Sequence, residues 1–235
     1  MGYPKYVSAA ERKERIEKSL KKLAKKNPNI EPVAIEGRTL VKSWWGKAWN
    51  KNLESYADYD NRIGRGKTYV RQGAVLDLKI SKGQVVALVQ GTRAKPYEVI
   101  IQINTLSRDK WDQIIIMCNN RIESLEKLIE GKFPKELEIL FLEQEYGLFP
   151  SPKEIHFNCS CPDWAYMCKH VAAVLYGIGT RLDKDPMLFF TLRDLDGMEL
   201  VKKSIEKKLG DILENAEKKS KRQISDQDIS DIFNI

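Results

Sequence analysis

The sequence has few of the features that would place it in a membrane or in an oxidising compartment. Of its 235 residues only four are cysteine and two are histidine. The longest apolar run, Val171 to Gly179, is far too short to cross a bilayer, so we expect no contact with a membrane. The N-terminus has no apolar core and no cleavage site, and Glu11, Glu14 and Glu17 are unusual in a transit peptide. We therefore expect a cytoplasmic protein whose thiols stay reduced.

The sequence also lacks the common signatures of nucleotide-dependent and hydrolytic enzymes. The letters GKT at residues 66–68 follow NRIGR and lack the first glycine of a phosphate-binding loop. Neither a pair of carboxylates nor a nucleophile elbow stands out. We therefore expect that the protein is not an enzyme and that it has no catalytic residues.

Charge is distributed unevenly along the chain. Residues 1–110 carry 23 Lys or Arg against 11 Asp or Glu, whereas residues 111–235 carry 17 against 22, within a net charge of +7. The front half is therefore basic and the back half acidic. A basic half favours a polyanionic partner such as nucleic acid, and surface charge that only keeps the chain soluble is the alternative.

The hydrophobic pattern predicts an α+β fold, in which a basic helix leads into an antiparallel β-meander with helices. Ser8 and Glu11 form a capping-box pattern, and Ile16, Leu20 and Leu23 follow at helical spacing. Three β-rich stretches are separated by the turn-like segments SKG and TRAKP, at residues 67–80, 84–91 and 97–103.

The second half predicts helices around one short strand. We expect a helix from Ser107 to Gly131, a strand at 154–161, and helices at 168–182 and at about 196–209. These elements divide the chain into four predicted parts. They are a basic N-terminal helix at 1–28, an α+β domain with the meander at 29–150, a small strand–loop–helix module at 151–180, and a helical C-terminal region with a short tail at 181–235.

Three of the four cysteines and one of the two histidines fall within twelve residues, in the order Cys159-x-Cys161, six residues, Cys168-x-His170. Three thiolates and one imidazole form a complete tetrahedral ligand set for Zn²⁺. Residues two apart on a strand point to the same side, so Cys159 and Cys161 present their sulfurs together. Cys168 and His170 would diverge inside a helix, so we place Cys168 just before the helix and His170 in its first turn.

Other uses of this cluster fit the residues less well. A disulfide is disfavoured in a reducing compartment, and an Fe–S cluster usually takes four cysteines. A catalytic thiol needs a nearby base, whereas His156 is expected on the opposite face of the strand from Cys159 because their spacing is odd. Four protein ligands leave no position for a catalytic water, so we expect one structural zinc ion.

The pattern C-x-C, a spacer and C-x-H between a strand and a helix resembles the SWIM zinc finger, over about Glu154 to Gly179. The stretches LVKSWWGKAWNKNLESY and NRIGRGKTYVRQGAVLDLKI also resemble prokaryotic proteins that contain this finger. The resemblance implies that the four cluster residues bind zinc. It also implies a module that binds DNA or protein, associated with a helicase-like ATPase of the SWI/SNF type.

The densest basic stretch outside the N-terminal helix is NRIGRGKTYVRQG, which we interpret as a glycine loop that binds nucleic acid. Its glycines let a backbone approach closely, its Arg and Lys supply phosphate affinity, and its tyrosine offers a ring for stacking. A solvated loop ahead of a strand is the alternative. The predicted contacts, with DNA favoured, are Arg62, Arg65, Lys67, Arg71 and, between the metal ligands, Lys169.

Two groups of aromatic residues lie near these candidates. Trp45 and Trp49 lie four residues apart and are expected in the core, which leaves Trp44 as a contact. Trp164 and Tyr166 lie between the metal ligands. We expect them to pack over the zinc loop, and stacking on bases or contact with a partner protein is the alternative.

The main hypothesis is therefore a zinc-stabilised protein that binds nucleic acid and works beside a helicase-like ATPase. The alternative is an adaptor that binds only protein, with a purely structural zinc. Such an adaptor would use the acidic back half and the C-terminal tail DISDIFNI. The two differ in salt dependence, because phosphate contacts weaken steeply as salt rises.

Overall fold

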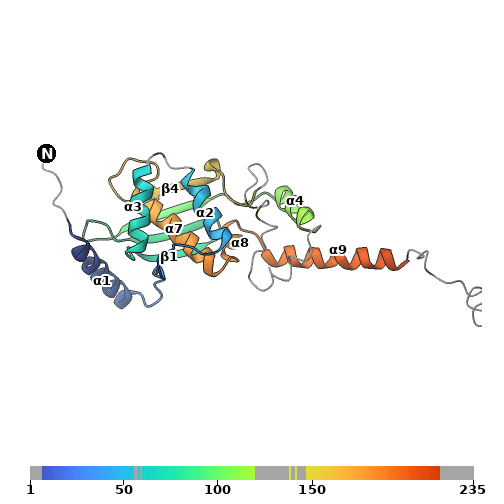
Figure 1. The fold of residues 1–235 in the computed structure, drawn as a ribbon, viewed down its shortest axis with the longest axis horizontal. Coiled ribbons are helices and arrows are strands. Elements are labelled where there is room, and N and C mark those ends of the chain that lie inside the picture. Colours follow the sequence, from blue (N-terminus) through green and yellow to red (C-terminus); the bar gives the residue numbers. More distant parts are fainter. Residues whose placement is uncertain are drawn as a thin grey trace, which may run out of the picture.

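The computed structural model describes residues 7–55, 58, 60–119, 138, 141 and 147–217. The predicted α+β class is confirmed, since helices pack against one antiparallel sheet of strand order β1-β2-β3-β4 (Figure 1). The strands are β1 (Val75–Ser81), β2 (Gln84–Val89), β3 (Tyr97–Ile103) and β4 (Ile155–Cys159). The helices are α1 (Ala9–Lys26), α2 (Trp44–Glu54), α3 (Asp60–Arg71), α4 (Arg108–Asn119), α7 (Lys169–Lys184), α8 (Leu188–Leu192) and α9 (Gly197–Glu217).

The meander is extended by a strand from far along the chain. Strands β1, β2 and β3 follow one another as predicted, and a turn at Gly83, whose φ is 65°, connects the first two. Strand β4 then pairs antiparallel with β3, so that Cys159 lies opposite Val99 and Ile155 opposite Ile103. The sheet therefore leads directly into the segment that holds the cysteines.

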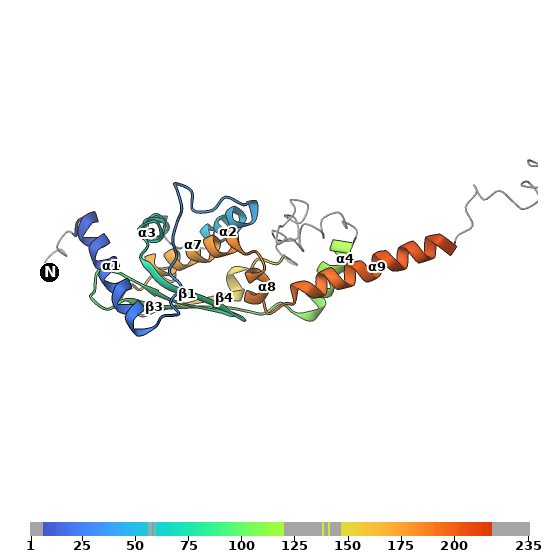
Figure 2. The same ribbon diagram turned by 90° about the horizontal axis from the view of Figure 1, so that it is seen from below.

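Helix α7 lies between the sheet and a second helical layer (Figure 2). It contacts all four strands, and α2 and α3 pack against it as well. Every residue from His170 to Thr180 is buried. A helix that is apolar on all sides belongs in a protein interior, which explains why the longest apolar run of the sequence lies here.

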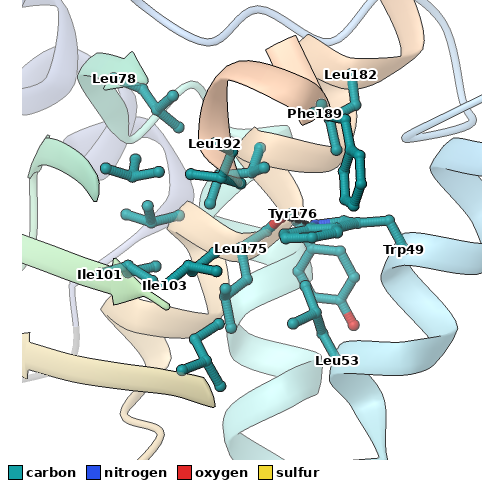
Figure 3. Close-up of a cluster of buried hydrophobic side chains, with 14 of the residues drawn as sticks. Trp49, Leu53, Leu78, Ile101, Ile103, Leu175, Tyr176, Leu182, Phe189 and Leu192 are labelled. Carbon is teal, nitrogen blue, oxygen red and sulfur yellow. Dashed lines mark hydrogen bonds between the residues drawn. The ribbon is translucent and has the colours of Figure 1, made fainter. Parts of the chain in front are cut away.

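Side chains from α2, α7, α8 and the sheet meet in the core (Figure 3). Trp49 is fully buried, and its Nε1–H donates to the carbonyl of Leu175 at 3.0 Å. Phe189 packs against the same indole, with 6.3 Å between ring centroids. The prediction of Trp49 as a core residue is confirmed. The half-buried Trp45 donates its Nε1–H to the carbonyl of Leu182 at 2.9 Å.

The stretch NRIGRGKTYVRQG is a helix, so the predicted glycine loop and a strand beginning at Lys67 are wrong. Helix α3 covers most of it and packs along α7. Gly66 and Val70 are buried in that contact, and tertiary packing outweighs the low helix propensity of glycine. The helix ends before Gly73, whose φ of 72° lets the chain turn into β1.

The C-terminal part contains two helices after α7. The predicted helix at about 196–209 is confirmed as α9, which continues to Glu217, whereas the short α8 was not predicted. The predicted helix from Ser107 is confirmed as far as Asn119, and its second half lies outside the described residues. The tail DISDIFNI also lies outside them. Among the described helices, none is both long and apolar enough to span a membrane.

The close contact of α3 with α7 yields a matched pair of glycine substitutions. In Gly66→Ala the new Cβ would lie 2.5 Å from the Cβ of Ala172, so the two helices must move apart. We expect a loss of about 1–3 kcal/mol in the free energy of unfolding. Gly64→Ala, in the same helix, meets no atom within 4 Å and should stabilise the protein by up to about 1 kcal/mol.

Urea unfolding of both variants, followed by circular dichroism, measures the two effects. Because each variant adds one methyl group to the same helix, helix propensity alone would stabilise both. Equal stabilisation of the two variants would contradict the close helix contact.

Candidate metal centre

Four side chains meet at the N-terminal end of α7. Cys159 is the last residue of β4, Cys161 follows in the next turn, Cys168 is the N-cap of α7, and His170 lies in the first turn of that helix. Their ligand atoms all lie within 4.8 Å of one another. The predicted positions of Cys168 and His170 at the helix start are confirmed.

The separations fit a tetrahedral zinc ion. The Sγ atoms of Cys159 and Cys168 each lie 3.9 Å from His170 Nδ1. Zinc bonds of about 2.3 Å to sulfur and about 2.0 Å to nitrogen separate neighbouring donors by roughly 3.5–3.8 Å. The side chains are thus positioned for one metal ion, and the donor set is that of a structural zinc site with all four ligands from protein.

A family model described as the SWIM zinc finger matches residues 157–177. That span includes all four ligands and the first half of α7. The chain contains a SWIM zinc finger. The resemblance to the SWIM zinc finger, predicted from the C-x-C and C-x-H spacing, is therefore confirmed. The family model matches only this part of the chain.

The similarity to one other protein extends well beyond the SWIM finger. "Uncharacterized protein Rv2102" of Mycobacterium tuberculosis is 33% identical over 163 residues. The match covers 69% of this chain and 58% of the relative, so this chain spans less than two thirds of that protein's length. No solved structure gives a significant match.

The sulfurs of the SWIM finger interact strongly with one another. The pKa of Cys168 is lowered to about 4, first because the Cys159 thiol donates a hydrogen bond to its sulfur. The N–H of Val171 in the first turn acts in the same direction, as expected at a helix N-terminus. The pKa of Cys159 is raised, first by the hydrogen bond to Cys168 and then by burial. Cys168 is therefore the thiol that loses its proton most readily. Metal binding releases the protons of the remaining thiols.

Packing holds the histidine of the SWIM finger in place. Tyr97 stacks on the His170 imidazole with 4.5 Å between ring centroids, and Tyr69 approaches edge-on at 5.4 Å. A Cβ atom at Gly91 would overlap the Tyr97 ring and lie 3.0 Å from His170 Nε2. This buried Nε2 has no hydrogen-bond partner among the described residues. Tyr69, proposed from the sequence to stack on a base, thus supports the metal ligand, and no sequence signal pointed to Tyr97 or Gly91.

The loop between the two ligand pairs is tied to the residues around the start of α3. The carboxylate of Asp58 accepts hydrogen bonds from the backbone N–H groups of Tyr166, at 3.0 Å, and Met167, at 3.3 Å. Asp163 forms an ion pair with Arg62 at 3.1 Å. These contacts fix the loop on both sides of its exposed tip. Contacts of this kind join residues about one hundred positions apart, so the local pattern gave no signal for them.

The predicted nucleic-acid contacts include two side chains that have structural partners. The ion pair of Arg62 with Asp163 is mostly shielded from solvent. Lys67 forms an ion pair with Glu54 at 2.9 Å and lies over the ring of Tyr176. Each of these cations is already neutralised, which makes both less suitable for phosphate.

The other three predicted contacts reach the surface to different degrees. Arg65 and Arg71 are exposed on α3, and Lys169 is half-buried in the first turn of α7. Burial raises the pKa of Tyr69, while the positive charges of Arg12 and Arg65 act in the opposite direction. Both guanidinium groups therefore lie near this ring, and α1 brings basic side chains towards the SWIM finger.

The aromatic candidates are arranged differently from the prediction. Trp44, proposed as a contact, is half-buried and packs edge-on against Phe141 at 5.6 Å. Tyr166 is held by a hydrogen bond from its hydroxyl to the carbonyl of Ile155 at 2.8 Å. Trp164, which was expected to cover the zinc loop, instead leaves 79% of its surface exposed.

The two histidines allow a matched test of the metal centre. His170→Ala should abolish binding of one zinc ion and lower the melting temperature by roughly 10 °C, because a structural metal contributes directly to folding. His156→Ala is the control, since this exposed side chain lies on β4 but outside the ligand group. Zinc content by atomic emission and thermal unfolding measure both variants. Retention of zinc in His170→Ala would contradict the assigned ligand set.

Proposed function

We propose that this protein binds nucleic acid, in the first place DNA, through basic side chains that surround the end of the molecule that holds the zinc. The observation that carries the proposal is the convergence of three basic elements there. They are α1, α3 and the β2–β3 loop at residues 90–96. We further propose that the protein acts in the cytoplasm as a binding protein and not as an enzyme, with the zinc as its structural support.

The β2–β3 loop links the basic helix α1 to the zinc site. Arg15 of α1 donates a hydrogen bond to the carbonyl of Thr92. Arg93, on the same loop, lies over the ring of Tyr97, whose ring also stacks on His170. Movement of the metal ligand would therefore move this loop, so that the SWIM finger supports the geometry of the basic surface.

A hollow of about 500 Å³ lies between α1 and the β2–β3 loop. Its lining includes three lysines, Lys22, Lys26 and Lys95. None of the described residues that line it is acidic. None of the three lysines forms an ion pair within the described part of the chain. Uncompensated ammonium groups on a concave surface attract phosphates, and each phosphate bound releases counterions. We call Lys22, Lys26 and Lys95 the lysine groove.

A salt series tests this proposal. We expect affinity for a labelled DNA duplex to fall steeply with salt concentration. Changing Lys22, Lys26 and Lys95 to Ala should reduce the slope of log affinity against log salt by about 2–3, because each phosphate contact contributes about 0.9. Fluorescence anisotropy at four or more salt concentrations provides the slopes, and an RNA duplex is measured beside the DNA.

The control variant removes the same charge elsewhere. Lys47, Lys79 and Lys153 are exposed and lie on α2, on β1 and just before β4. Changing all three to Ala should leave the slope within about one unit of the wild-type value. Equal losses in the two triple variants would show that net charge alone attracts the DNA. No binding at low salt would reject the proposal.

A second candidate function, docking to a protein, is favoured by α9. Met198, Ile205 and Ile212 recur every seven residues and are 58%, 47% and 54% exposed. This spacing aligns them along one face of the helix, with Leu209 beside them. We propose that this face contacts the helicase-like ATPase of the SWI/SNF type that the SWIM resemblance implies.

Charge placed on that face tests the second candidate. Ile205→Glu with Ile212→Glu should weaken binding of a purified SWI/SNF-type ATPase from the same genome at least tenfold, while zinc content stays unchanged. Lys207→Glu puts a carboxylate on the opposite, exposed side of α9 and should have little effect. Surface plasmon resonance measures both variants, and equal affinities would reject this docking face.

A further inference from the structure

We propose that the lysine groove takes up an unpaired base together with its phosphates, so that the preferred ligand of this protein is single-stranded nucleic acid. This inference rests on the proposed nucleic-acid function and makes it more specific. The phosphates lie against the lysines, and the base lies on the apolar side chains between them. Three features carry the inference, namely the apolar lining of the groove, two acidic side chains beside it and the different lining of a neighbouring hollow.

Apart from its lysines and Ser19, the described lining of the groove is apolar. The lysines are exposed, whereas Leu23, Leu88 and Pro96 are half-buried, so these three residues form the floor of the hollow and the ammonium groups its rim. We call Leu23, Leu88 and Pro96 the apolar floor. A ligand made only of phosphates would leave this floor uncovered, whereas a nucleobase has a flat face that can bury it.

Leu88 reaches the groove from the more exposed face of the sheet. Alternate residues of β2 are buried, and Val86 and Leu88 lie between them with half-buried side chains. Leu23 packs against the buried core, whereas Leu88 is not among the described residues that do so. One partly exposed apolar side chain is ordinary on a protein surface. Leu88 differs because its apolar surface lies in a hollow that three uncompensated lysines line.

Two acidic side chains beside the apolar floor favour a neutral base there over a phosphate. Asp77 and Glu98 lie opposite Leu88 on β1 and β3, so they share its face of the sheet. Neither lines the groove, and Asp77 accepts a hydrogen bond from the N–H of Glu31 at 2.8 Å. Their negative charge repels phosphate from the floor, while the lysines attract it to the rim. A nucleotide is therefore oriented with its base inwards.

A second hollow adjoins the lysine groove and has a different lining. Its volume is about 680 Å³, and it shares three residues with the groove. Glu11 and Glu14 line it beside the basic residues, and Glu14 forms an ion pair with Lys18 at 2.6 Å. Acids thus compensate much of the positive charge there. The favourable site for a strand is therefore confined to the lysine groove.

The strandedness follows from how bases are packed in a duplex. Both faces of a paired base are covered by neighbouring bases, and the phosphates lie on the outside, so a duplex offers phosphates to the lysines but no base face to the apolar floor. An unpaired base can turn into the hollow while its phosphates stay at the rim. The lysines therefore serve both ligands, and the apolar floor distinguishes them.

Two matched substitutions on β2 test the inference on the full zinc-loaded chain. Leu88→Thr removes apolar surface from the floor, whereas Val86→Thr places the same residue on the same face, two positions away and outside the groove. Fluorescence anisotropy measures binding of three probes. They are a single strand of deoxythymidylate, a duplex of equal length, and a single strand of equal length with abasic sites in place of bases.

We expect Leu88→Thr to weaken binding of the single strand about fourfold or more, since roughly one buried methylene group is lost. It should change binding of the duplex and of the abasic strand by less than about twofold, with an unchanged salt slope because no charge is removed. Val86→Thr should change binding of every probe by less than about twofold. Zinc content of both variants should equal that of wild type, since neither residue is a metal ligand.

A photochemical crosslink locates the base without any substitution. A single strand that carries a thiothymidine base is irradiated in complex with the wild-type protein, and the crosslinked peptides are identified by mass spectrometry. We expect crosslinks to residues 19–26 or 88–96, which contain the described lining of the groove. This measurement does not depend on how well Leu88→Thr folds.

The outcomes distinguish this inference from the function on which it rests. Salt-dependent binding that is unaffected by Leu88→Thr would overturn the site for the base and leave the nucleic-acid function standing. Equal weakening of single strand and duplex would also overturn it, as would crosslinks confined to residues outside the groove. Failure of the wild-type protein to bind any of the three probes would reject both proposals.

Discussion

The burial of α7 on all sides is the constraint on which the rest of the structure depends. The sheet, α2 and α3 all pack against this one helix, and small residues make room for them. A Cβ atom at Gly177 would lie 2.8 Å from a methyl group of Leu78, and one at Gly179 would lie 2.5 Å from the side-chain oxygen of Asn50. The direction of α7, and with it the position of its first turn, is therefore set by close contacts along its whole length.

The metal centre is a consequence of that fixed direction. The pairing of β4 with β3 places Cys159 at the N-terminal end of α7. Cys168 is the N-cap of that helix, and His170 lies in its first turn. A short finger standing alone would take most of its folding free energy from the metal. Here the strand and the helix of the finger are also part of the main core, so the zinc fixes the connecting loop between two elements that are packed in their own right. Trp164 lies on this loop and is 79% exposed.

The basic side chains of α3 fall into two groups, those that form ion pairs within the fold and those that are exposed to solvent. Arg62 and Lys67 face partners on the zinc loop and on α2, whereas Arg65 between them in sequence points to solvent. The helical period contributes to this division, since residues five apart, such as Arg62 and Lys67, lie on different parts of the surface of α3 and meet different acids. The lysine groove depends on the same principle, because α1 buries Ile16 and turns its lysines outwards.

The sequence alone determined the features that depend on neighbouring residues. The capping box at Ser8, the three meander strands and the four zinc ligands follow from local spacing, because strand and helix periods dictate which side chains can meet. Only the tertiary structure decided that NRIGRGKTYVRQG is a helix, since the contact that favours it is made by Gly66 with Ala172, a residue far along the chain. The same holds for the partners of Arg62 and for the exposure of Trp164. Long-range packing assigns these side chains to the interior or to the surface, and no local pattern records it.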